Sequence, residues 1–284
     1  MALTQRLRRL AEQSPWTLAE LQRQFAYDRF LQRLNARDDG WVLKGAAALL
    51  AREVSSRTTR DVDVYRRAGL LEAEIALREA LALDLGDWFT FDAGRSRQMT
   101  AGVMGLTIAV TARIGIREWE SFNVDLFGEA AGMTGEPEAV PALARIDLTE
   151  LRQPGYRVWP LADHVADKLA ATFATYGRSN RPSTRVKDLI DLVVLAHCAH
   201  VSADDAIAAV RAQASRREIV LPGRFDIPDL DHWRRHYPIE ARKARGLSEQ
   251  TLGAPVCIDP SFCDLRLAGS GPGAWDPVTR PALR

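Results

Sequence analysis

KGAAALLAREVSSRTTRDVDVY, residues 44–65, is the stretch that decides how this chain is interpreted. Its pattern predicts the end of a strand, a glycine turn at Gly45, a short helix over 46–53, a polar loop and a second strand over 60–65. Gly45 has no Cβ, so backbone at the helix start can approach a phosphate closely, and the helix N-terminus offers free N–H groups to it. The stretch therefore predicts a phosphate-binding turn followed by a strand.

The second strand carries Asp61 and Asp63, separated by one residue. Side chains alternate between faces along a strand, so the two carboxylates share one face while Val62 and Val64 point into a core. Oxygen ligands placed in this way suit Mg²⁺, which is often shared with substrate phosphates. Asp is disfavoured in strands, which favours a metal site for phosphoryl or nucleotidyl transfer over a solvated acidic pair.

The composition is that of an ordinary globular protein of 284 residues with a net charge of +1. A nucleic-acid partner would therefore have to bind a local basic patch. No apolar run approaches the roughly 20 residues that a membrane helix needs, and the segment MALTQRLRRLAEQSPW does not resemble a signal peptide. The three cysteines, Cys198, Cys257 and Cys263, show no metal-binding spacing. We expect a cytoplasmic protein with reduced thiols and no membrane contact.

The order of predicted elements is mixed first and helical afterwards, which predicts an α+β fold with a ligand cleft between two lobes. Residues 1–135 are expected to form an N-terminal lobe with a small mixed sheet, and residues 136–284 a helical lobe with an irregular tail after Gly246. Strands are predicted over 41–43, 60–65, 88–91, 105–112 and 120–127, and a linker over 128–158. Helices are predicted over 3–14, 17–35 (with Ser14 as a cap), 46–53, 70–83 (with Leu71 and Ile75 in its apolar stripe), 161–176, 185–200, 202–215 (capped by Ser202) and 227–245.

Asp125, in the segment SFNVDLF, repeats the pattern of Asp63 because its apolar neighbours Val124 and Leu126 face the other way. If the two strands are neighbours, Asp125 completes a carboxylate triad with Asp61 and Asp63 that could hold two Mg²⁺ ions. A solvent-facing carboxylate is an equally good interpretation of the pattern alone.

Lys168 projects beside the apolar stripe of its predicted helix, away from the face of Asp163 and Asp167, where a solvated lysine would lie. It could reach across a cleft to a triphosphate, or lay its stem over apolar surface. Asp188 and Asp191, three apart on the next helix, could orient Lys168 or act as a base towards an acceptor hydroxyl, with structural ion pairs as the alternative.

Basic side chains are interleaved with aromatic rings further along, where Arg234, Arg235, Arg242 and Lys243 surround Trp233, His236 and Tyr237. Such a mixture suits an RNA backbone with unstacked bases, and solvated helix faces explain it equally well. His197 and His200 lack a third ligand in the sequence, which favours a structural role over metal binding.

Taken together, these residues resemble the motifs of the AbiEii-type nucleotidyltransferase toxins, the MenT-like enzymes of type IV toxin–antitoxin systems. The first motif of that family is a K-G-G/S turn, a short helix and R-x-T-x-D-x-D, which Arg57, Thr59, Asp61 and Asp63 match. ADKLAA around Lys168 and RVKDLIDL around Asp188 and Asp191 resemble the later motifs. The resemblance spans about residues 40–200. It departs at Ala46, where the family has Gly or Ser, so this chain has no hydroxyl there for regulation.

The resemblance implies a polymerase-β-like nucleotidyltransferase fold, an NTP substrate, Mg²⁺ and transfer of a nucleoside monophosphate with release of pyrophosphate. It also implies the 3′ end of tRNA as acceptor, which would block translation, and a cognate antitoxin as partner. The residues that it assigns to NTP binding are Lys44, Gly45, Ala46, Arg57, Thr59 and Lys168. Those that it assigns to catalysis are Asp61, Asp63, Lys168 and Asp188, with Asp61, Asp63 and Asp125 holding the metal and Asp191 in support.

Two other functions are compatible with the same residues. A transferase with this metal site could modify a protein or a small molecule in place of RNA. A non-catalytic module that binds RNA or a partner would retain the fold without turnover, although the intact aspartate pair and Lys168 favour an enzyme. Labelled nucleotide on protein, drug or RNA would distinguish these alternatives.

Overall fold

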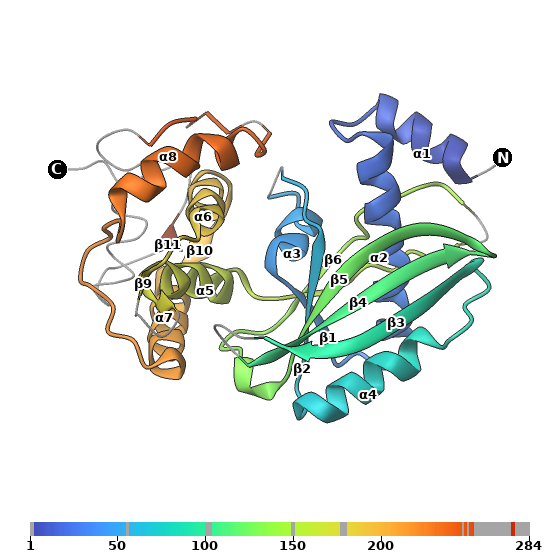
Figure 1. Ribbon diagram of the computed structural model, residues 1–284, viewed down its shortest axis with the longest axis horizontal. Helices are drawn as coiled ribbons and strands as arrows, with labels where there is room; N and C mark the ends of the chain where they lie inside the picture. The colour runs from blue at the N-terminus through green and yellow to red at the C-terminus, as the bar shows by residue number, and fades with distance from the viewer. Residues whose placement is uncertain are drawn as a thin grey trace.

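Seven strands form one mixed sheet in the N-terminal part of the protein (Figure 1). The computed structural model describes residues 3–54, 57–99, 104–148, 151–176, 181–245, 247–248, 250–252 and 274–275. The strands, in the order in which they lie across the sheet, are β3 (Phe89–Gln98), β4 (Gly105–Ile114), β5 (Arg117–Phe127), β2 (Asp61–Arg66), β1 (Trp41–Lys44), β7 (Tyr156–Val158) and β6 (Glu138–Val140). Pairs β2–β5 and β1–β7 are parallel and the other pairs are antiparallel, so the predicted mixed sheet is confirmed.

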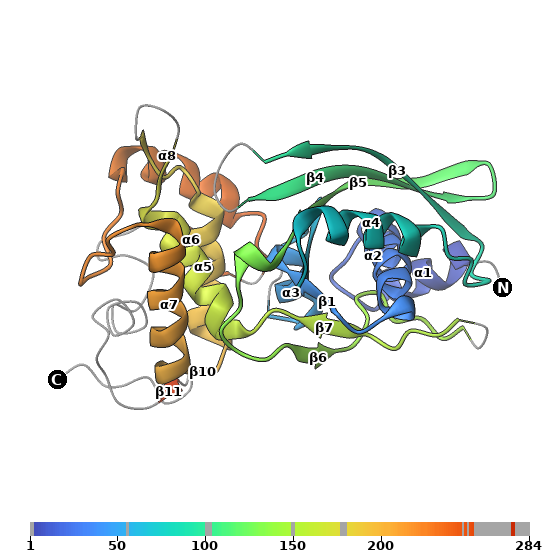
Figure 2. The ribbon, with the colours of Figure 1, turned by 90° about the horizontal axis from the view of Figure 1, so that it is seen from below.

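Three helices fill the hollow of this sheet. Figure 2 shows β3, β4 and β5 on one side of the helices and β1, β7 and β6 on the other. The helices are α1 (Leu3–Glu12), α2 (Leu18–Arg37) and α4 (Leu70–Leu81). Apolar residues from these helices and from the sheet form one continuous core. This core fixes the sheet as a rigid platform for the side chains on its other face.

Four of the described helices form a separate bundle that begins after β7 (Figure 1). They are α5 (Leu161–Phe173), α6 (Val186–Cys198), α7 (Ala203–Arg217) and α8 (Leu230–Ala241), with a one-turn helix η1 (Glu129–Ala131) on the sheet side. Two short ladders accompany them, β8 (Thr175–Tyr176) with β9 (Arg181–Pro182) and β10 (Val201–Ser202) with β11 (Ala274–Trp275). A second apolar core lies within the bundle.

Helix α3 (Gly45–Ala51) joins the two parts. Its Ala47, Ala48 and Ala51 belong to the core of the sheet, whereas its Leu49 belongs to the core of the bundle. Small side chains on one face let α3 lie close against the sheet, while the larger Leu49 reaches the bundle. The short helix after Gly45 is thus held from both sides.

The sheet continues past residue 135, because β6 and β7 belong to it and Tyr156 and Val158 lie in its core. The expected linker over 128–158 therefore contains two strands. We propose that the two lobes meet at about Pro160, between β7 and α5, and the division into two domains stays a prediction. The tail after Gly246 lies mostly outside the described residues.

Several local predictions need correction. Thr17 caps α2 in place of Ser14, because the Thr17 hydroxyl accepts from Glu20 N–H and the Glu20 carboxylate accepts from Thr17 N–H. Leu71 and Ile75 are 72% and 51% exposed, because α4 buries its alanines and Leu77 against the sheet. Strand β3 extends to Gln98, beyond the predicted end at 91. The predicted cap of α7 by Ser202 is confirmed.

Candidate active site

The predicted acidic residues meet on one face of the sheet, at the centre of strands β1, β2 and β5. Val62 and Val64 of β2 are fully buried, so Asp61 and Asp63 occupy the opposite face, as predicted. Asp63 lies between Lys44 on β1 and Asp125 on β5 in the register of the strands. Two acidic side chains far apart in the sequence therefore become direct neighbours.

Asp61 and Asp125 each have a hydrogen-bond partner from a neighbouring strand. Asn123 Nδ2 donates to Asp61 Oδ1 at 3.3 Å, and Thr107 Oγ1 on β4 donates to Asp125 Oδ1 at 2.6 Å. Thr59 Oγ1 accepts from Asp61 N–H at 3.3 Å, which forms the turn that leads into β2. These bonds orient the carboxylates and leave oxygen atoms of each for other ligands.

Burial and like charge raise the pKa of Asp63 to about 6. Desolvation is the larger cause, followed by the negative charge of Asp125, and Lys44 opposes both. The pKa of Asp125 is also raised, chiefly by burial, with the Thr107 hydrogen bond opposing. Neighbouring carboxylates whose ionisation is disfavoured provide a site that a cation would stabilise.

This raised pKa predicts how stability depends on pH. The folded pKa of Asp63 exceeds its ordinary value of 3.8, so its contribution is present below about pH 4 and is lost as the pH rises through about 6. Between these pH values the free energy of unfolding of the wild type should fall by at most about 2–3 kcal/mol relative to that of Asp63→Asn, because the asparagine side chain cannot ionise. Urea unfolding of both proteins in metal-free buffer from pH 4 to 7.5 measures the difference. A difference that does not change with pH would contradict the raised pKa.

Gly45 is required by its close approach to Asp63. Its φ of +61° lies in the left-handed region, and a Cβ built on it would lie 1.9 Å from Asp63 Oδ2. A side chain at this position would push the Asp63 carboxylate away from its place beside Asp125.

Gly45→Ala should therefore lower the free energy of unfolding by about 2–4 kcal/mol, the sum of backbone strain and overpacking. Gly86→Ala is the matched control, because Gly86 has a φ of +68° and open space around its missing Cβ. It should lose only about 1 kcal/mol. Chemical denaturation measures the free energy of unfolding of both variants. Equal losses in Gly45→Ala and Gly86→Ala would show that the close approach of Gly45 to Asp63 does not affect stability.

The bundle supplies a charged cluster that faces these carboxylates. Lys168 Nζ on α5 lies 2.6 Å from Asp191 Oδ2 and 3.3 Å from Asp188 Oδ1 on α6. Arg57 donates from Nε and a terminal nitrogen to the two oxygens of Asp191 at 2.8 and 2.7 Å. Arg185 also pairs with Asp188. The predicted Lys168, Asp188 and Asp191 thus lie together, and Arg57 of the loop before β2 joins them.

Charge pairing controls the ionisation of this cluster. The pKa values of Asp191 and Asp188 are lowered, because the attraction of Lys168 and of the arginines outweighs burial. The pKa of Lys168 is raised by both aspartates although burial opposes it. Lys168 is therefore a fixed cation, and Asp188 is a weak base.

Lys44 is held by a residue that the sequence placed on a solvated face. Its Nζ lies 2.9 Å from Asp167 Oδ2 and 4.0 Å from the centre of the Trp159 ring. Asp163, one turn earlier on α5, is fully buried and accepts from the backbone N–H of Thr134 at 3.0 Å. The face of α5 that carries both aspartates packs against the sheet part, which was not apparent from the sequence.

A cavity of about 660 Å³ lies between the sheet and the bundle and brings most of the predicted site together. Asp61, Asp63 and Asp125 line it from the sheet, and Lys168 and Asp188 line it from the bundle. The cavity is also lined by Gly45, Ala46, Arg57, Thr59, Arg60, Arg185, Lys187 and Lys243. Lys44 lies outside this set, and Asp191 is buried behind Lys168 and Arg57. The cavity can hold a polyanion beside a group of carboxylates.

Three residues of the site were missed by sequence reasoning. Thr107 and Asn123 have no motif of their own, although both stand on the polar face of alternating strands. Asp167 depends on a contact between elements distant in sequence. Strand alternation could have indicated the first two, whereas nothing local indicates Asp167.

The aromatic residues of the basic segment do not form a base-stacking surface. Trp233 and Tyr237 are fully buried in the core of the bundle, and Trp233 Nε1 donates to Ser183 O at 2.8 Å. His232 and His236 stack on each other on the outside of α8, with ring centres 4.1 Å apart. Of the described aromatic rings in this segment, Trp233 and Tyr237 are therefore not available for stacking on a base.

Among the described residues, no three His, Cys, Asp or Glu side chains converge closely enough to hold a metal ion by themselves. Asp61, Asp63 and Asp125 are neighbours in register without forming such a closed group, and His197 and His200 form none either. Cys198 is a free, exposed thiol, and Cys257 and Cys263 lie outside the described residues. No helix in the described ranges has the length and apolar character to cross a bilayer.

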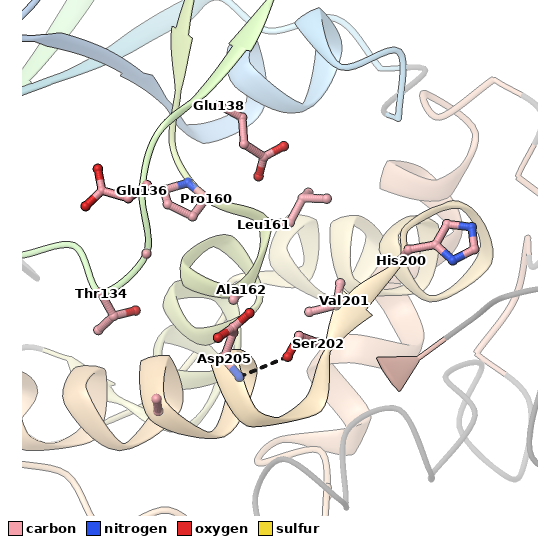
Figure 3. A pocket seen from close by; sticks show the side chains of 12 residues that line it. Thr134, Glu136, Glu138, Pro160, Leu161, Ala162, His200, Val201, Ser202 and Asp205 are labelled. Carbon is pink, nitrogen blue, oxygen red and sulfur yellow. Dashed lines mark hydrogen bonds between the residues drawn. The ribbon is translucent and has the colours of Figure 1, made fainter. Parts of the chain in front are cut away.

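A separate cavity of about 290 Å³ lies where the segment before β6 meets the starts of α5 and α7 (Figure 3). Glu136, Glu138 and Asp205 line it, together with His200. It contains none of the predicted catalytic residues, and its acidic lining disfavours an anionic nucleotide.

A comparison with protein families matches residues 29–262 to the model described as "Nucleotidyl transferase AbiEii toxin, Type IV TA system". The chain belongs to this family. The match covers the sheet, the cavity and the bundle, and it confirms the resemblance drawn from the motifs. A search of curated proteins found no match.

Two solved structures illustrate what this chain is similar to. The nucleotidyltransferase toxin MenT4 of Mycobacterium tuberculosis has 16% sequence identity and a TM-score of 0.50, covering 95% of this chain and 89% of its own. JHP933 of Helicobacter pylori has 15% identity and a TM-score of 0.42, covering 86% and 88%. The likeness to MenT4 confirms the predicted nucleotidyltransferase fold.

Proposed function

We propose that this AbiEii-family toxin transfers a nucleoside monophosphate from an NTP to the 3′ end of tRNA, in a reaction that depends on Mg²⁺ and blocks translation. The observation that carries the proposal is the placement of Asp61, Asp63 and Asp125 on one wall of a cavity whose other wall holds Lys168. Carboxylates that bind a cation and cations that bind a polyanion are the two requirements of phosphoryl transfer.

The donor set fits Mg²⁺ in its chemistry. All three aspartates offer oxygen. Burial, and after it repulsion from Asp125, raises the pKa of Asp63, and a divalent cation would offset both effects. Mg²⁺ is commonly bound by one or two carboxylates, with waters and substrate phosphates completing its shell. When bound, Mg²⁺ supplies charge neutralisation at the reacting phosphate.

The other residues have roles that follow from their contacts. The backbone at Gly45 and Ala46, the side chains of Lys168 and Arg57, and Thr59 would bind the phosphates. The acceptor oxygen forms a bond to the α-phosphorus, the bond from that phosphorus to pyrophosphate breaks, and the proton of the acceptor hydroxyl passes to solvent water. Asp188 has a lowered pKa and bonds Lys168, which favours positioning of Lys168 over removal of that proton. Asp191 holds Lys168 and Arg57 in place.

The partners that we propose follow from the family. A type IV system implies a cognate antitoxin, and both NTP and tRNA are available in the cytoplasm, where we place the protein. The basic side chains at the bundle side of the cavity, Arg185, Lys187 and Lys243, would contact the acceptor RNA backbone.

The test is incubation of the purified protein with total tRNA and Mg²⁺, with each of the four α-labelled NTPs in turn. Label on the 3′ end of tRNA, absent when EDTA replaces Mg²⁺, is the expected result. Label on added protein or on a small molecule but not on RNA would show a transferase with another acceptor. Binding of RNA without any transfer of label would favour the non-catalytic module.

A further inference from the structure

The cavity between sheet and bundle has a second, smaller arm. This arm has a volume of about 130 Å³ and shares Gly45, Asp63, Lys168, Arg185 and Asp188 with the large cavity. Its remaining wall differs, because His164 and Asp167 of α5 and Arg217 at the end of α7 line it, together with Lys44. Helices α5 and α7 pack side by side (Figures 1 and 2), which brings these three side chains to one place.

Three buried polar atoms around this arm have no hydrogen-bond partner among the described residues. They are His164 Nε2, Asp167 Oδ1 and Arg217 Nε, and an ion pair of 3.8 Å joins a terminal nitrogen of Arg217 to Asp167 Oδ1. His164 is only 2% exposed, and the other oxygen of Asp167 binds Lys44 at 2.9 Å. Buried polar atoms are nearly always satisfied in folded proteins, so three unsatisfied atoms at one cavity indicate a ligand.

The character of the arm differs from that of the large cavity. Met99, Phe127 and Ala171 provide apolar walls, and burial lowers the pKa of His164 well below its usual range, which keeps the imidazole neutral. Binding sites for flat organic groups combine apolar walls with a few precisely placed polar atoms. The volume is well below the roughly 300–1,000 Å³ of a site for a whole drug-sized ligand, so the arm suits one ring system.

We propose that this arm binds the nucleobase of the NTP and that His164, Asp167 and Arg217 read its hydrogen-bonding edge. The inference rests on the proposed function, because the phosphates of the same NTP would lie at Asp63 and Lys168, where the two arms meet. Cations of the small arm are already paired, Lys44 with Asp167 and both Lys168 and Arg185 with Asp188, so a phosphate there would compete with carboxylates. A base instead offers donors and acceptors to the Asp167 carboxylate and to the imidazole. These three residues then determine which nucleotide is transferred.

The experiment is equilibrium binding of the four α,β-methylene NTP analogues and of inorganic tripolyphosphate, with Mg²⁺, measured by calorimetry. Wild type should prefer one base by about tenfold or more, the contribution of one or two hydrogen bonds. His164→Phe keeps a buried ring and loses the ring nitrogens, and Arg217→Gln loses the guanidinium. Each variant should reduce the preference for one base to about twofold. The affinity of each variant for tripolyphosphate should stay within about twofold of that of the wild type. Arg216→Gln, an exposed neighbour on the same helix, is the matched control and should leave the preference unchanged.

Several results would overturn the inference. Variants that retain the base preference would show that the arm does not read the base. An equal loss of affinity for tripolyphosphate and for every analogue would place phosphate in the arm. If the wild type bound all four analogues equally but still transferred nucleotide, the base-binding role of the arm would be rejected and the proposed function would stand. If the wild type neither bound an analogue nor transferred label, the proposed function would be rejected as well. Should His164→Phe not fold, Arg217→Gln, with a side chain 15% exposed, decides the question.

Discussion

Asp63→Asn should transfer nucleotide at least about 10³-fold more slowly than wild type, while folding normally. The carboxylate lies between Lys44 and Asp125 in the register of the sheet and lines both arms of the cavity. Loss of a ligand to a catalytic cation removes several kcal/mol of transition-state stabilisation, and each 1.36 kcal/mol is a factor of ten in rate. Single-turnover transfer of label to tRNA measures the rate, and circular dichroism checks the fold.

Asp92→Asn is the matched control for this prediction. Asp92 stands on β3 of the same sheet, its side chain is 69% exposed, and it forms an ion pair with Arg113 on the neighbouring strand. Its removal should leave the rate within about twofold, since exposed ion pairs contribute little. An Asp63→Asn protein that retained more than a tenth of wild-type activity would remove Asp63 from the catalytic centre.

The sequence predicted the positions of these carboxylates well where local patterns suffice, and their catalytic role stays a prediction. The alternation of Asp61 and Asp63 with two buried valines is a period of two, which any strand must show. The partnership of Asp63 with Asp125 needed the parallel pairing of β2 with β5, which no local signal contains. The sequence could therefore predict that Asp125 lies beside Asp63 only on the condition that their strands are neighbours, and the structure shows that they are.

Other expectations went wrong because tertiary contacts override local patterns. Trp233 and Tyr237 stand among cations in the sequence, but α8 turns them into the core of the bundle. Asp167 stands on the polar face of α5, yet this face meets Lys44 from the sheet. A polar residue on one face of an amphipathic helix is exposed to solvent only when no other element packs against that face.

Asp191→Ala should lower the free energy of unfolding by about 3–5 kcal/mol, the cost of leaving buried charges unpaired. Asp191 is 1% exposed and accepts from Lys168 on α5 and from Arg57 in the loop before β2. Without it, burial would disfavour the ionised Lys168, whose remaining partner Asp188 lies at 3.3 Å and is shared with Arg185. Urea denaturation with linear extrapolation measures the loss.

The double variant Asp191→Leu with Lys168→Met separates unpaired charge from lost packing. Replacing a buried ion pair by apolar side chains of similar volume is often neutral, so the double variant should recover much of the stability that Asp191→Leu loses. Both variants should still transfer nucleotide poorly, because Arg57 loses the contact that ties its loop to α6 and because Lys168 is moved or absent. A single variant that lost less than about 1 kcal/mol would show that Lys168 and Arg57 find other partners. In that case Asp191 would not be the residue that holds the cations of the bundle at the cavity.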